Sequence, residues 1–534
     1  MRLDYLYLDG YKGLKNFEVD FKKQPSGAAI HFFIGRNGSG KSTLLEAIGL
    51  IFTRMLQGEL PGFGFELRYQ MADGAQIRVK PAAKDASGGK LEIEVIQDGN
   101  TRRLDRISEQ YLPDRIISYC SGSNHSMEEI LLSSPKASLA SDLYDLSLAE
   151  EDGQAEQELE EILHYYEQLE RNPRALFLDG ITSGFVLPVL FSILPVSFPV
   201  EREEQEEHER RKEREEQEAR LREYNRRREK LAGRLSIKLD PVAFSIQVDE
   251  EKLEAAGDIP QINILRRIFG MGTDRSELLG DFTVRRQMSG QTDAEGNPLM
   301  ETTVTFLYRN YGNEEKPVYY NPGLQRFFGG NPFVFLSALL TAYRKGVIRA
   351  VTFAFRDGDK KGLYETEALS DGELMWLSRM GLVLMAQPFC GVDTLFLFDE
   401  PDVHFNDDWN RDFVKVIYEL SEGTGHGFVV ATHSTLILTD AEYEQITLLE
   451  HESETGMEVK EADISTFAAQ RDEISKQIFD ADAIGAYAEE AVRQMMEETN
   501  PEKMRGNLRR LGPGYERFRL WEQFYSLEDT RREG

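Results

Sequence analysis

The feature that most constrains the fold is a glycine-rich motif that lies between an apolar run and a helical pattern. It fits the pattern G-x-x-x-x-G-K-[S/T] without a mismatch and comprises Gly35, Arg36, Asn37, Gly38, Ser39, Gly40, Lys41, Ser42 and Thr43. Residues 28–34 before it (AAIHFFI) favour a buried strand, and the apolar residues after Lys41 recur at helical spacing. A strand, a glycine loop and a helix in this order are what a phosphate-binding loop requires. The sequence therefore predicts that the chain binds a nucleoside triphosphate.

The motif supplies several kinds of group to a phosphate. Glycines let backbone N–H groups turn inward, and the N-terminus of the following helix adds partial positive charge. Lys41 is expected to reach the β- and γ-phosphates, and Ser42 is expected to ligate Mg²⁺. We therefore expect ATP and Mg²⁺ as cofactors. A chance glycine-rich turn before a helix is the alternative, and the strand and helix around the motif count against it.

Two carboxylates follow a second apolar run, at residues 394–398 (TLFLF). Four apolar residues before an Asp-Glu pair are typical of a central parallel strand with both acids at its C-terminal end. Asp399 is then expected to hold Mg²⁺, directly or through water, and Glu400 to orient or deprotonate the attacking water. Two surface acids after a strand are the alternative interpretation.

Two further segments are candidates for phosphate contacts. Residues 368–373 (ALSDGE) precede a helical run, so N–H groups, the Ser370 hydroxyl and a helix dipole converge there. Residues 427–432 (GFVVAT) predict a strand that ends in His433. An imidazole on the same edge as Glu400 could hydrogen-bond the γ-phosphate, whereas a lone histidine is more often structural.

In their order along the chain, these motifs resemble those of ABC-type ATPases of the SMC and RecF-like branch. The resemblance covers about residues 1–130 and 345–450. It implies an α/β fold: an ABC-type ATPase head with a mixed central sheet and flanking helices, interrupted by a helical insertion with a charged solvent-exposed helix. It also implies that two heads sandwich two ATP molecules, so that Ser370, Gly372 and Glu373 of one copy complete the phosphate loop of the other. We therefore expect a homodimer, or a higher oligomer of dimers.

The sequence departs from that branch in two places. Its members have a metal- and water-contacting glutamine after the strand expected at 114–120, where this chain offers Ser121 or Ser123. The long coiled-coil arms of SMC proteins are replaced by residues 201–230, in which opposite charges recur four residues apart. That pattern predicts a solvated helix that projects from the body. A nucleic-acid-binding arm is the more specific alternative.

Within the branch, residues 399–406 (DEPDVHFN) and 474–487 resemble the PtuA family of Septu and retron-associated ATPases of bacterial anti-phage defence. This resemblance implies a separate HNH-type nuclease subunit that the ATPase regulates, and it adds a reverse transcriptase or retron nucleic acid as a candidate partner. The alternatives are a RecF- or SMC-like repair or recombination ATPase that acts on DNA, and a transporter-associated ATPase.

The motifs divide the chain into four predicted regions. Residues 1–135 form the N-terminal half of the head, 136–235 a helical insertion with the charged helix, 236–455 the C-terminal half of the head, and 456–534 a helical partner-binding region. Basic and aromatic residues are interleaved between 503 and 532, which favours a helical packing or partner-binding face over a platform for DNA. Residues 141–171 are expected to be largely helical, and residues 272–296 to be polar and mobile.

Composition limits the partners and the compartment. The net charge of −30, with a pI near 4.8, opposes general attraction to nucleic acid, so any DNA contact has to come from local basic patches. The two cysteines, Cys120 and Cys390, exclude a disulfide framework and fit a reducing cytosol. No export signal is visible, and the glycines and prolines of the apolar residues 175–200 favour a buried helix and strand over a membrane span. We therefore expect a cytoplasmic protein without a membrane partner.

Overall fold

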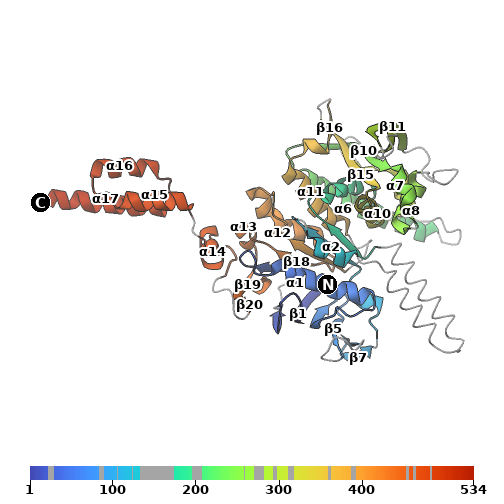
Figure 1. The fold of residues 1–534 in the computed structure, drawn as a ribbon, viewed down its shortest axis with the longest axis horizontal. Helices are drawn as coiled ribbons and strands as arrows, with labels where there is room; N and C mark the ends of the chain where they lie inside the picture. Colours follow the sequence, from blue (N-terminus) through green and yellow to red (C-terminus); the bar gives the residue numbers. More distant parts are fainter. Residues whose placement is uncertain are drawn as a thin grey trace. The chain divides into compact units, whose positions relative to one another are not determined.

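Figure 1 shows the computed structural model of the chain, which describes residues 1–21, 29–82, 90–104, 106–122, 124–132, 173–194, 207–257, 259–269, 282–292, 298–310, 318–358, 362–386, 393–452, 456–460, 465–481 and 484–533. These residues form two compact units, Met1–Phe467 and Ala468–Gly534. The predicted helix at 141–171, together with Ser123 and Cys390, lies outside the described residues.

A seven-stranded sheet in the first unit carries the strands that the motifs predicted. Its order is β20-β19-β3-β18-β17-β8-β9, and neighbours pair in parallel except β20, which is antiparallel to β19. The strands are β3 (Ala29–Ile34), β8 (Arg115–Cys120), β9 (Ala175–Leu178), β17 (Thr394–Asp399), β18 (Gly427–Ala431), β19 (Ile446–Glu452) and β20 (Gly456–Lys460). The strands β8, β17 and β18 are buried along their whole length, which explains the apolar runs of β17 and β18. The expected α/β fold with a mixed central sheet is confirmed.

Helices cover both faces of this sheet. On one face, α1 (Lys41–Leu56) shares an apolar core with residues of β17 and β18. On the other face, the rings of Phe396 and Phe428 stack with their centroids 4.7 Å apart. The hydroxyl of Tyr119 contacts the sulfur of Met375 in α11 (Asp371–Met385) on that side, at 3.7 Å. Because successive residues of a strand point to opposite faces, one apolar strand contributes side chains to the cores on both faces of the sheet.

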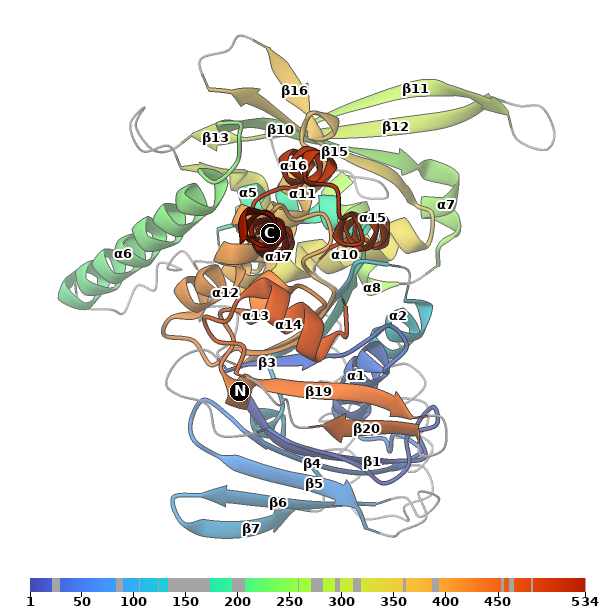
Figure 2. The same cartoon turned by 90° about the vertical axis from the view of Figure 1, so that its left-hand side faces the viewer.

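An antiparallel sheet extends the core around α1. Its order is β2-β1-β4-β5-β6-β7, and Figure 2 shows it beside β19 and β20. The strands are β1 (Arg2–Asp9), β2 (Phe17–Asp20), β4 (Gly64–Gln70), β5 (Gln76–Pro81), β6 (Leu91–Gln97) and β7 (Asn100–Leu104). Alternate residues such as Leu6, Leu67 and Val79 point into the core that α1 also lines.

A third sheet lies at the other end of the first unit in Figure 2, with the order β11-β12-β10-β15-β16. Its strands are β10 (Leu239–Asp249), β11 (Phe282–Thr292), β12 (Pro298–Leu307), β15 (Ile348–Asp357) and β16 (Leu363–Glu365). The expectation of a polar, mobile stretch at 272–296 was wrong for residues 282–292. Backbone pairing with β12, and the stacking of Phe282 on Phe306 at 5.8 Å, hold this segment as a strand despite its polar side chains.

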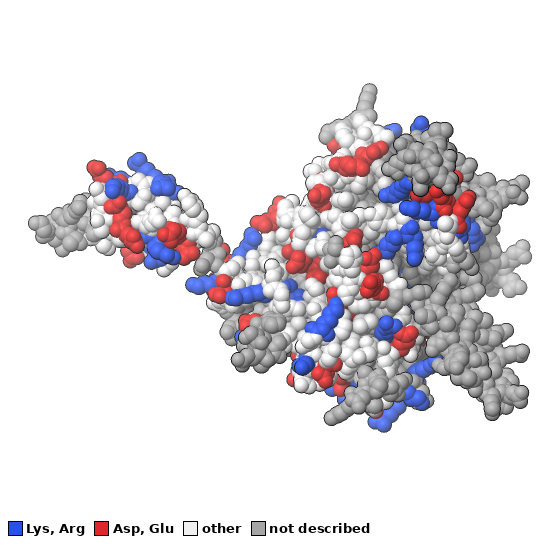
Figure 3. Space-filling model, in the orientation of Figure 1, with Lys and Arg blue, Asp and Glu red and all other residues white. Residues whose placement is uncertain are grey.

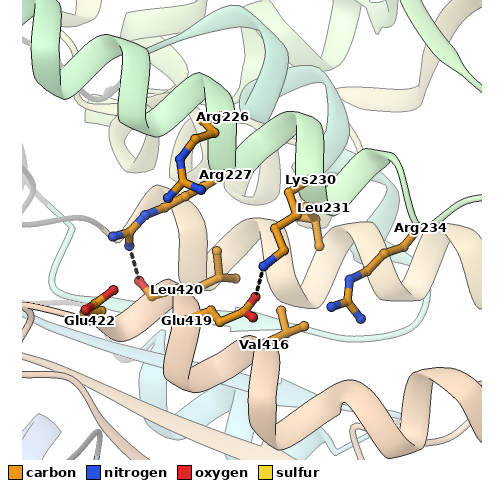
Figure 4. Close-up of a pocket in the computed structure, with 9 residues that line it drawn as sticks. All are labelled: Arg226, Arg227, Lys230, Leu231, Arg234, Val416, Glu419, Leu420 and Glu422. Carbon is orange, nitrogen blue, oxygen red and sulfur yellow. Dashed lines mark hydrogen bonds and ion pairs between the residues drawn. The ribbon is translucent and has the colours of Figure 1, made fainter.

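The charged helix is confirmed as α6 (Glu207–Ala232), but its second half packs against the body. Among the side chains of this helix that the structure describes, four are buried: Tyr224, Asn225, Arg228 and Leu231. On the adjoining side, Lys230 pairs with Glu419 at 2.7 Å and Arg227 donates to the Leu420 carbonyl at 3.1 Å, as Figure 4 shows. The sequence predicted a solvated helix because the segment has few apolar residues. Long basic side chains can nevertheless be buried where oxygen atoms accept hydrogen bonds from their charged ends.

The apolar stretch at 175–200 folds inside the first unit as far as the structure describes it. After β9, α5 (Val186–Ser192) is buried along its whole length. Among the described residues, no helix is both long enough and apolar enough to cross a membrane. The remaining helices and short strands of the unit are α2 (His125–Leu131), α7 (Glu250–Ala255), α8 (Pro260–Phe269), β13 (Arg309–Asn310), β14 (Tyr319–Tyr320), α9 (Pro322–Phe328), α10 (Pro332–Arg344), α12 (Asp407–Ser421) and α13 (Thr435–Leu438).

The second unit is helical and has a core of its own. Its helices are α14 (Arg471–Ile478), α15 (Ala486–Met496), α16 (Pro501–Arg510) and α17 (Tyr515–Glu533). Five buried residues from α15, α16 and α17 form the core: Met495, Met504, Leu508, Leu520 and Phe524. The division of the chain into four regions by its motifs stays a prediction.

Candidate functional site

The ends of three adjacent parallel strands bring the predicted groups together. β3 leads into the phosphate loop, β17 ends in Asp399, and β18 leads into His433. Because β18 pairs with both β3 and β17, the C-terminal ends of all three lie at one edge of the sheet. The structure therefore assembles the phosphate loop, Asp399, Glu400 and His433 within one chain.

The phosphate loop has the backbone that its glycines permit. Gly38 and Gly40 have φ of 82° and 89°, in the left-handed region. A Cβ on Gly40 would also displace the flexible end of the Met457 side chain from β20, but the positive φ is what favours glycine there. The ammonium of Lys41 donates to the carbonyls of Gly35 at 2.9 Å and Arg36 at 3.2 Å. Burial lowers the pKa of Lys41, and the charges of Glu400 and Asp399 oppose that shift.

Asp399 and Ser42 offer the oxygen atoms that a magnesium ion prefers. Burial raises the pKa of the Asp399 carboxyl, while a hydrogen bond from the Ser42 hydroxyl opposes the rise. Mg²⁺ binds through one or two protein oxygens together with phosphate and water, so these two side chains fit it. The thiol of Cys120 lies 3.7 Å from the Asp399 carboxylate. Burial and the Asp399 charge raise the pKa of that thiol to about 12, so it stays protonated and is a poor ligand at neutral pH.

Glu400 lies in a strained but well-held backbone position. Its φ is 49°, a left-handed value that costs a non-glycine residue about 1 kcal/mol. Its amide donates to the Ala431 carbonyl of β18 at 2.8 Å. Nε2 of His433 lies 3.4 Å from the Glu400 carboxylate. Burial, with the nearby charge of Lys41, lowers the pKa of His433, so a neutral imidazole faces the carboxylate at pH 7.

The segment at 370–373 forms a closed capping box at the start of α11. The Ser370 hydroxyl accepts from the Glu373 amide, and the Glu373 carboxylate accepts from the Ser370 amide at 3.0 Å. The other carboxylate oxygen of Glu373 accepts from the amide and hydroxyl of Ser236, which follows α6. Burial by itself would raise the pKa of Glu373, but these hydrogen bonds hold that pKa below its usual value. Among the described residues, none of the hydrogen bonds of Ser370 or Glu373 reaches the phosphate loop.

Gly372 is buried between α11 and the loop that follows Glu400. A Cβ on Gly372 would lie 2.7 Å from the His404 carbonyl oxygen and 2.8 Å from the Trp409 ring. Packing within the chain therefore requires glycine at position 372, independently of any contact with another molecule. Ser370 and Asp371, in contrast, are exposed.

A fully buried arginine on α11 holds the same loop. The guanidinium of Arg379 donates to the carbonyls of Pro401 and Val403, the latter at 3.0 Å, and to the hydroxyl of Tyr119. The ring of Phe405 lies 4.8 Å from the guanidinium carbon. Asp402, in the middle of the loop, accepts from the hydroxyl of Thr432 at 2.6 Å. The loop after Glu400 is thus fixed from both α11 and β18.

The sequence analysis missed several contacting residues, among them Cys120, Ser236, Arg379 and Met457. Only Cys120 could have been found from the sequence, because it is the last residue of the strand after which members of the SMC and RecF-like branch have a glutamine. Ser121, one of the two residues considered there, donates its amide to the Asp399 carbonyl at 3.1 Å. The other three residues lie far in sequence from the groups they contact, and no motif marks them.

Comparison with known proteins gives a family and several distant structural likenesses. The family model described as "AAA domain, putative AbiEii toxin, Type IV TA system" matches residues 30–439. No curated protein matches the chain. An SMC head bound to the C-winged helix domain of ScpA is 13% identical, with 86% of this chain and 97% of that chain covered and a TM-score of 0.33. The SMC head domain from Thermotoga maritima is 10% identical, with 87% and 100% covered and a TM-score of 0.32.

The hydrogen bonds of Arg379 lead to a prediction about the loop after Glu400. Arg379→Met should lower the free energy of unfolding by about 2–4 kcal/mol, because three buried oxygens lose their donor. Amide hydrogen exchange between Glu400 and Phe405 should become faster, as mass spectrometry can measure. The control is Arg222→Met on the exposed part of α6, which should change stability by less than about 0.5 kcal/mol. Unchanged exchange in the Arg379 variant would contradict the assigned role.

Proposed function

Since this chain belongs to the family described as "AAA domain, putative AbiEii toxin, Type IV TA system", we propose that it is an ATPase whose two heads close around ATP. The observation that carries the proposal is the meeting of Lys41, Asp399, Glu400 and His433 at one edge of the central sheet. A phosphate-binding lysine, a metal carboxylate and a second carboxylate placed for water are the parts that phosphoryl transfer to water requires.

Each side chain has a distinct role in this proposal. Lys41 leaves the carbonyls of Gly35 and Arg36 to bind the β- and γ-phosphates, and Ser42 and Asp399 hold Mg²⁺. The ion supplies charge neutralisation at the phosphates. Glu400 orients the attacking water and accepts its proton. The neutral imidazole of His433 donates to the γ-phosphate, and its contact with Glu400 keeps the two groups on the same side of the nucleotide.

A second copy supplies the other half of the site. The exposed Ser370 lies at the N-terminus of α11, where unpaired amides and the helix dipole favour an anion. The Ser370 hydroxyl then exchanges its internal acceptor, the Glu373 carboxylate, for a phosphate oxygen of the partner. Glu373 remains anchored by Ser236 and keeps the helix terminus in place. ATP is therefore the ligand that joins two heads.

The downstream role proposed for this ATPase is the control of a separate HNH-type nuclease in anti-phage defence. Its support is the resemblance of residues 399–406 and 474–487 to the PtuA family. In this scheme the nucleotide state of the heads determines whether the nuclease is held or released.

Copurification tests the effector. The tagged chain, expressed with the genes that adjoin its own, should elute with a nuclease subunit, and native mass spectrometry should give the stoichiometry. Elution of the chain without any such subunit, from cells in which the neighbouring proteins are detected, would remove the effector part of the proposal.

Substitution of Glu400 tests the chemistry. Glu400→Gln should lower the rate of ATP hydrolysis by about 100-fold or more, because the amide cannot accept a proton from water. ATP binding should persist, so the variant should accumulate as an ATP-bound closed dimer in light scattering. Lys41→Ala is the matched comparison, and it should lose nucleotide binding in calorimetry. Normal ATP binding by the Lys41 variant, or rapid hydrolysis by the Glu400 variant, would contradict the assignment.

Mixing two inactive variants tests whether the site is shared. Lys41→Ala lacks the phosphate lysine, and Ser370→Arg blocks the approach of the α11 terminus to a phosphate. After subunit exchange, the mixture should recover roughly a quarter of wild-type activity, because half of the dimers are mixed and each mixed dimer has one intact site. Each variant alone is the control. If the mixture is as inactive as its components, Ser370 does not act on the partner's nucleotide.

A further inference from the structure

The connection between α6 and β10 contacts the beginning of α11. The amides of Gly233 and Leu235 donate to carbonyls of the last residues of α6, so hydrogen-bonded turns continue that helix almost to Ser236. The amide of Ser236 then donates to one carboxylate oxygen of Glu373 at 3.0 Å, and its hydroxyl donates to the same oxygen. Glu373 lies in the first turn of α11 and is 6% exposed. The end of α6 is thereby joined to the start of α11.

A second contact joins the same two elements. The guanidinium carbon of Arg234 lies 5.7 Å from the centre of the Trp376 ring, and the guanidinium also pairs with Asp412 of α12. Trp376 follows Glu373 by three residues and is fully buried, so both contacts fall on one side of α11. Residues 234–236 therefore hold the beginning of α11 at two points.

The carboxylate of Glu373 links this connection to Ser370. One oxygen accepts from Ser236, and the other accepts from the amide and the hydroxyl of Ser370, each at 3.0 Å. A carboxylate offers about four sites for hydrogen bonds, and these donors fill them. When the Ser370 hydroxyl turns to another acceptor, the remaining donors have to keep the carboxylate in place. Ser236 supplies two of those three donors.

The position of Ser370 matters because long-range attraction does not guide its encounter with a phosphate. The chain has a net charge of −30 and a triphosphate is anionic, so the general field opposes the approach of a second copy with bound ATP. Figure 3 shows acidic and basic side chains side by side on the visible face of the first unit, a mixture whose field is largely screened beyond about 10 Å. A hydroxyl beside the charge of Glu373 therefore has to be placed accurately to meet a phosphate.

We propose that the connection after α6, through Ser236, positions Ser370 for the nucleotide bound to a second copy. The proposal rests on the proposed function, in which Ser370 donates to a phosphate of the partner. Ser236 is a positioning residue in this scheme, because it fixes Glu373 and Glu373 fixes the end of α11. Since hydrogen-bonded turns continue α6 to Leu235, the placement of α6 in one copy sets the rate of hydrolysis at the nucleotide of the other.

Mixed dimers distinguish an effect on the partner's nucleotide from an effect on the chain's own nucleotide. When Lys41→Ala and Ser370→Arg chains exchange subunits, each mixed dimer has one intact site, which combines Lys41 of the second chain with Ser370 of the first. Ser236→Ala in the Lys41→Ala chain should lower the recovered hydrolysis about tenfold, as expected for the loss of a hydrogen bond to a charged group. Ser236→Ala in the Ser370→Arg chain should leave the recovered hydrolysis unchanged.

The design contains its own control for folding. Both mixtures carry the same substitutions in different chains, so a general loss of stability would lower hydrolysis in both of them. Ser236→Thr keeps the hydroxyl and should preserve hydrolysis when it replaces Ser236→Ala in the first mixture. Ser245→Ala removes a different hydroxyl, which bonds with that of Thr305 in the third sheet at 2.8 Å, and should affect neither mixture.

Hydrogen exchange of the nucleotide-free chain gives a second measurement that needs no dimer. In the single variant Ser236→Ala, amides within residues 368–374 should exchange faster than in the wild type, because Glu373 holds the Ser370 amide less firmly. Residues 35–43 of the phosphate loop should exchange at the wild-type rate. The affinity of the variant for ATP in calorimetry should also equal that of the wild type, since Ser236 acts on the nucleotide of the other copy.

Three outcomes would overturn the role of Ser236. These are an equal loss of hydrolysis in both mixtures, no loss in either, and unchanged exchange within residues 368–374. The proposed function survives each of them as long as the parent mixture of Lys41→Ala and Ser370→Arg recovers activity. A parent mixture without activity refutes the shared site itself, and the role of Ser236 falls with it.

Discussion

The parallel pairing of β17 between β18 and β8 is the interaction on which the site depends. In that register Asp399 lies opposite Ala431 on one side and Cys120 on the other. The last backbone hydrogen bonds of the sheet therefore determine how far each strand carries its polar residue toward the phosphate loop. A slip of one residue in β17 would turn the side chain of Asp399 to the other face of the sheet, away from the phosphate loop.

Charge within the site is balanced over a small buried volume. Lys41 is buried close to two carboxylates, and its positive charge offsets part of the cost of their burial. The same charge, after burial, helps to lower the pKa of His433, so a neutral imidazole lies near the lysine.

Much of the fold and the site could be predicted from the sequence because the information was local. The phosphate loop, the buried strands β3, β8, β17 and β18, and the helix that begins after Ser370 all depend on residues within one short window. The predictions that were wrong or incomplete depend on partners distant in the chain. The buried half of α6 is held by oxygens of other elements, such as the carbonyl of Leu420. The contact of Ser236 with Glu373 spans 137 residues, and no periodicity reports such a pair.

Arg379 has a mechanical consequence for the first unit. Its charge is effectively permanent, and within the described residues the oxygens it donates to are two backbone carbonyls and one hydroxyl. If the loop after Glu400 moved away from α11, the buried guanidinium would lose two of its three acceptors, the carbonyls of Pro401 and Val403, which is more costly than moving both elements together. The helix and the loop therefore behave as one rigid body. Any displacement of the exposed end of α11 is delivered directly to the backbone of Glu400, with no flexible segment between them to absorb it.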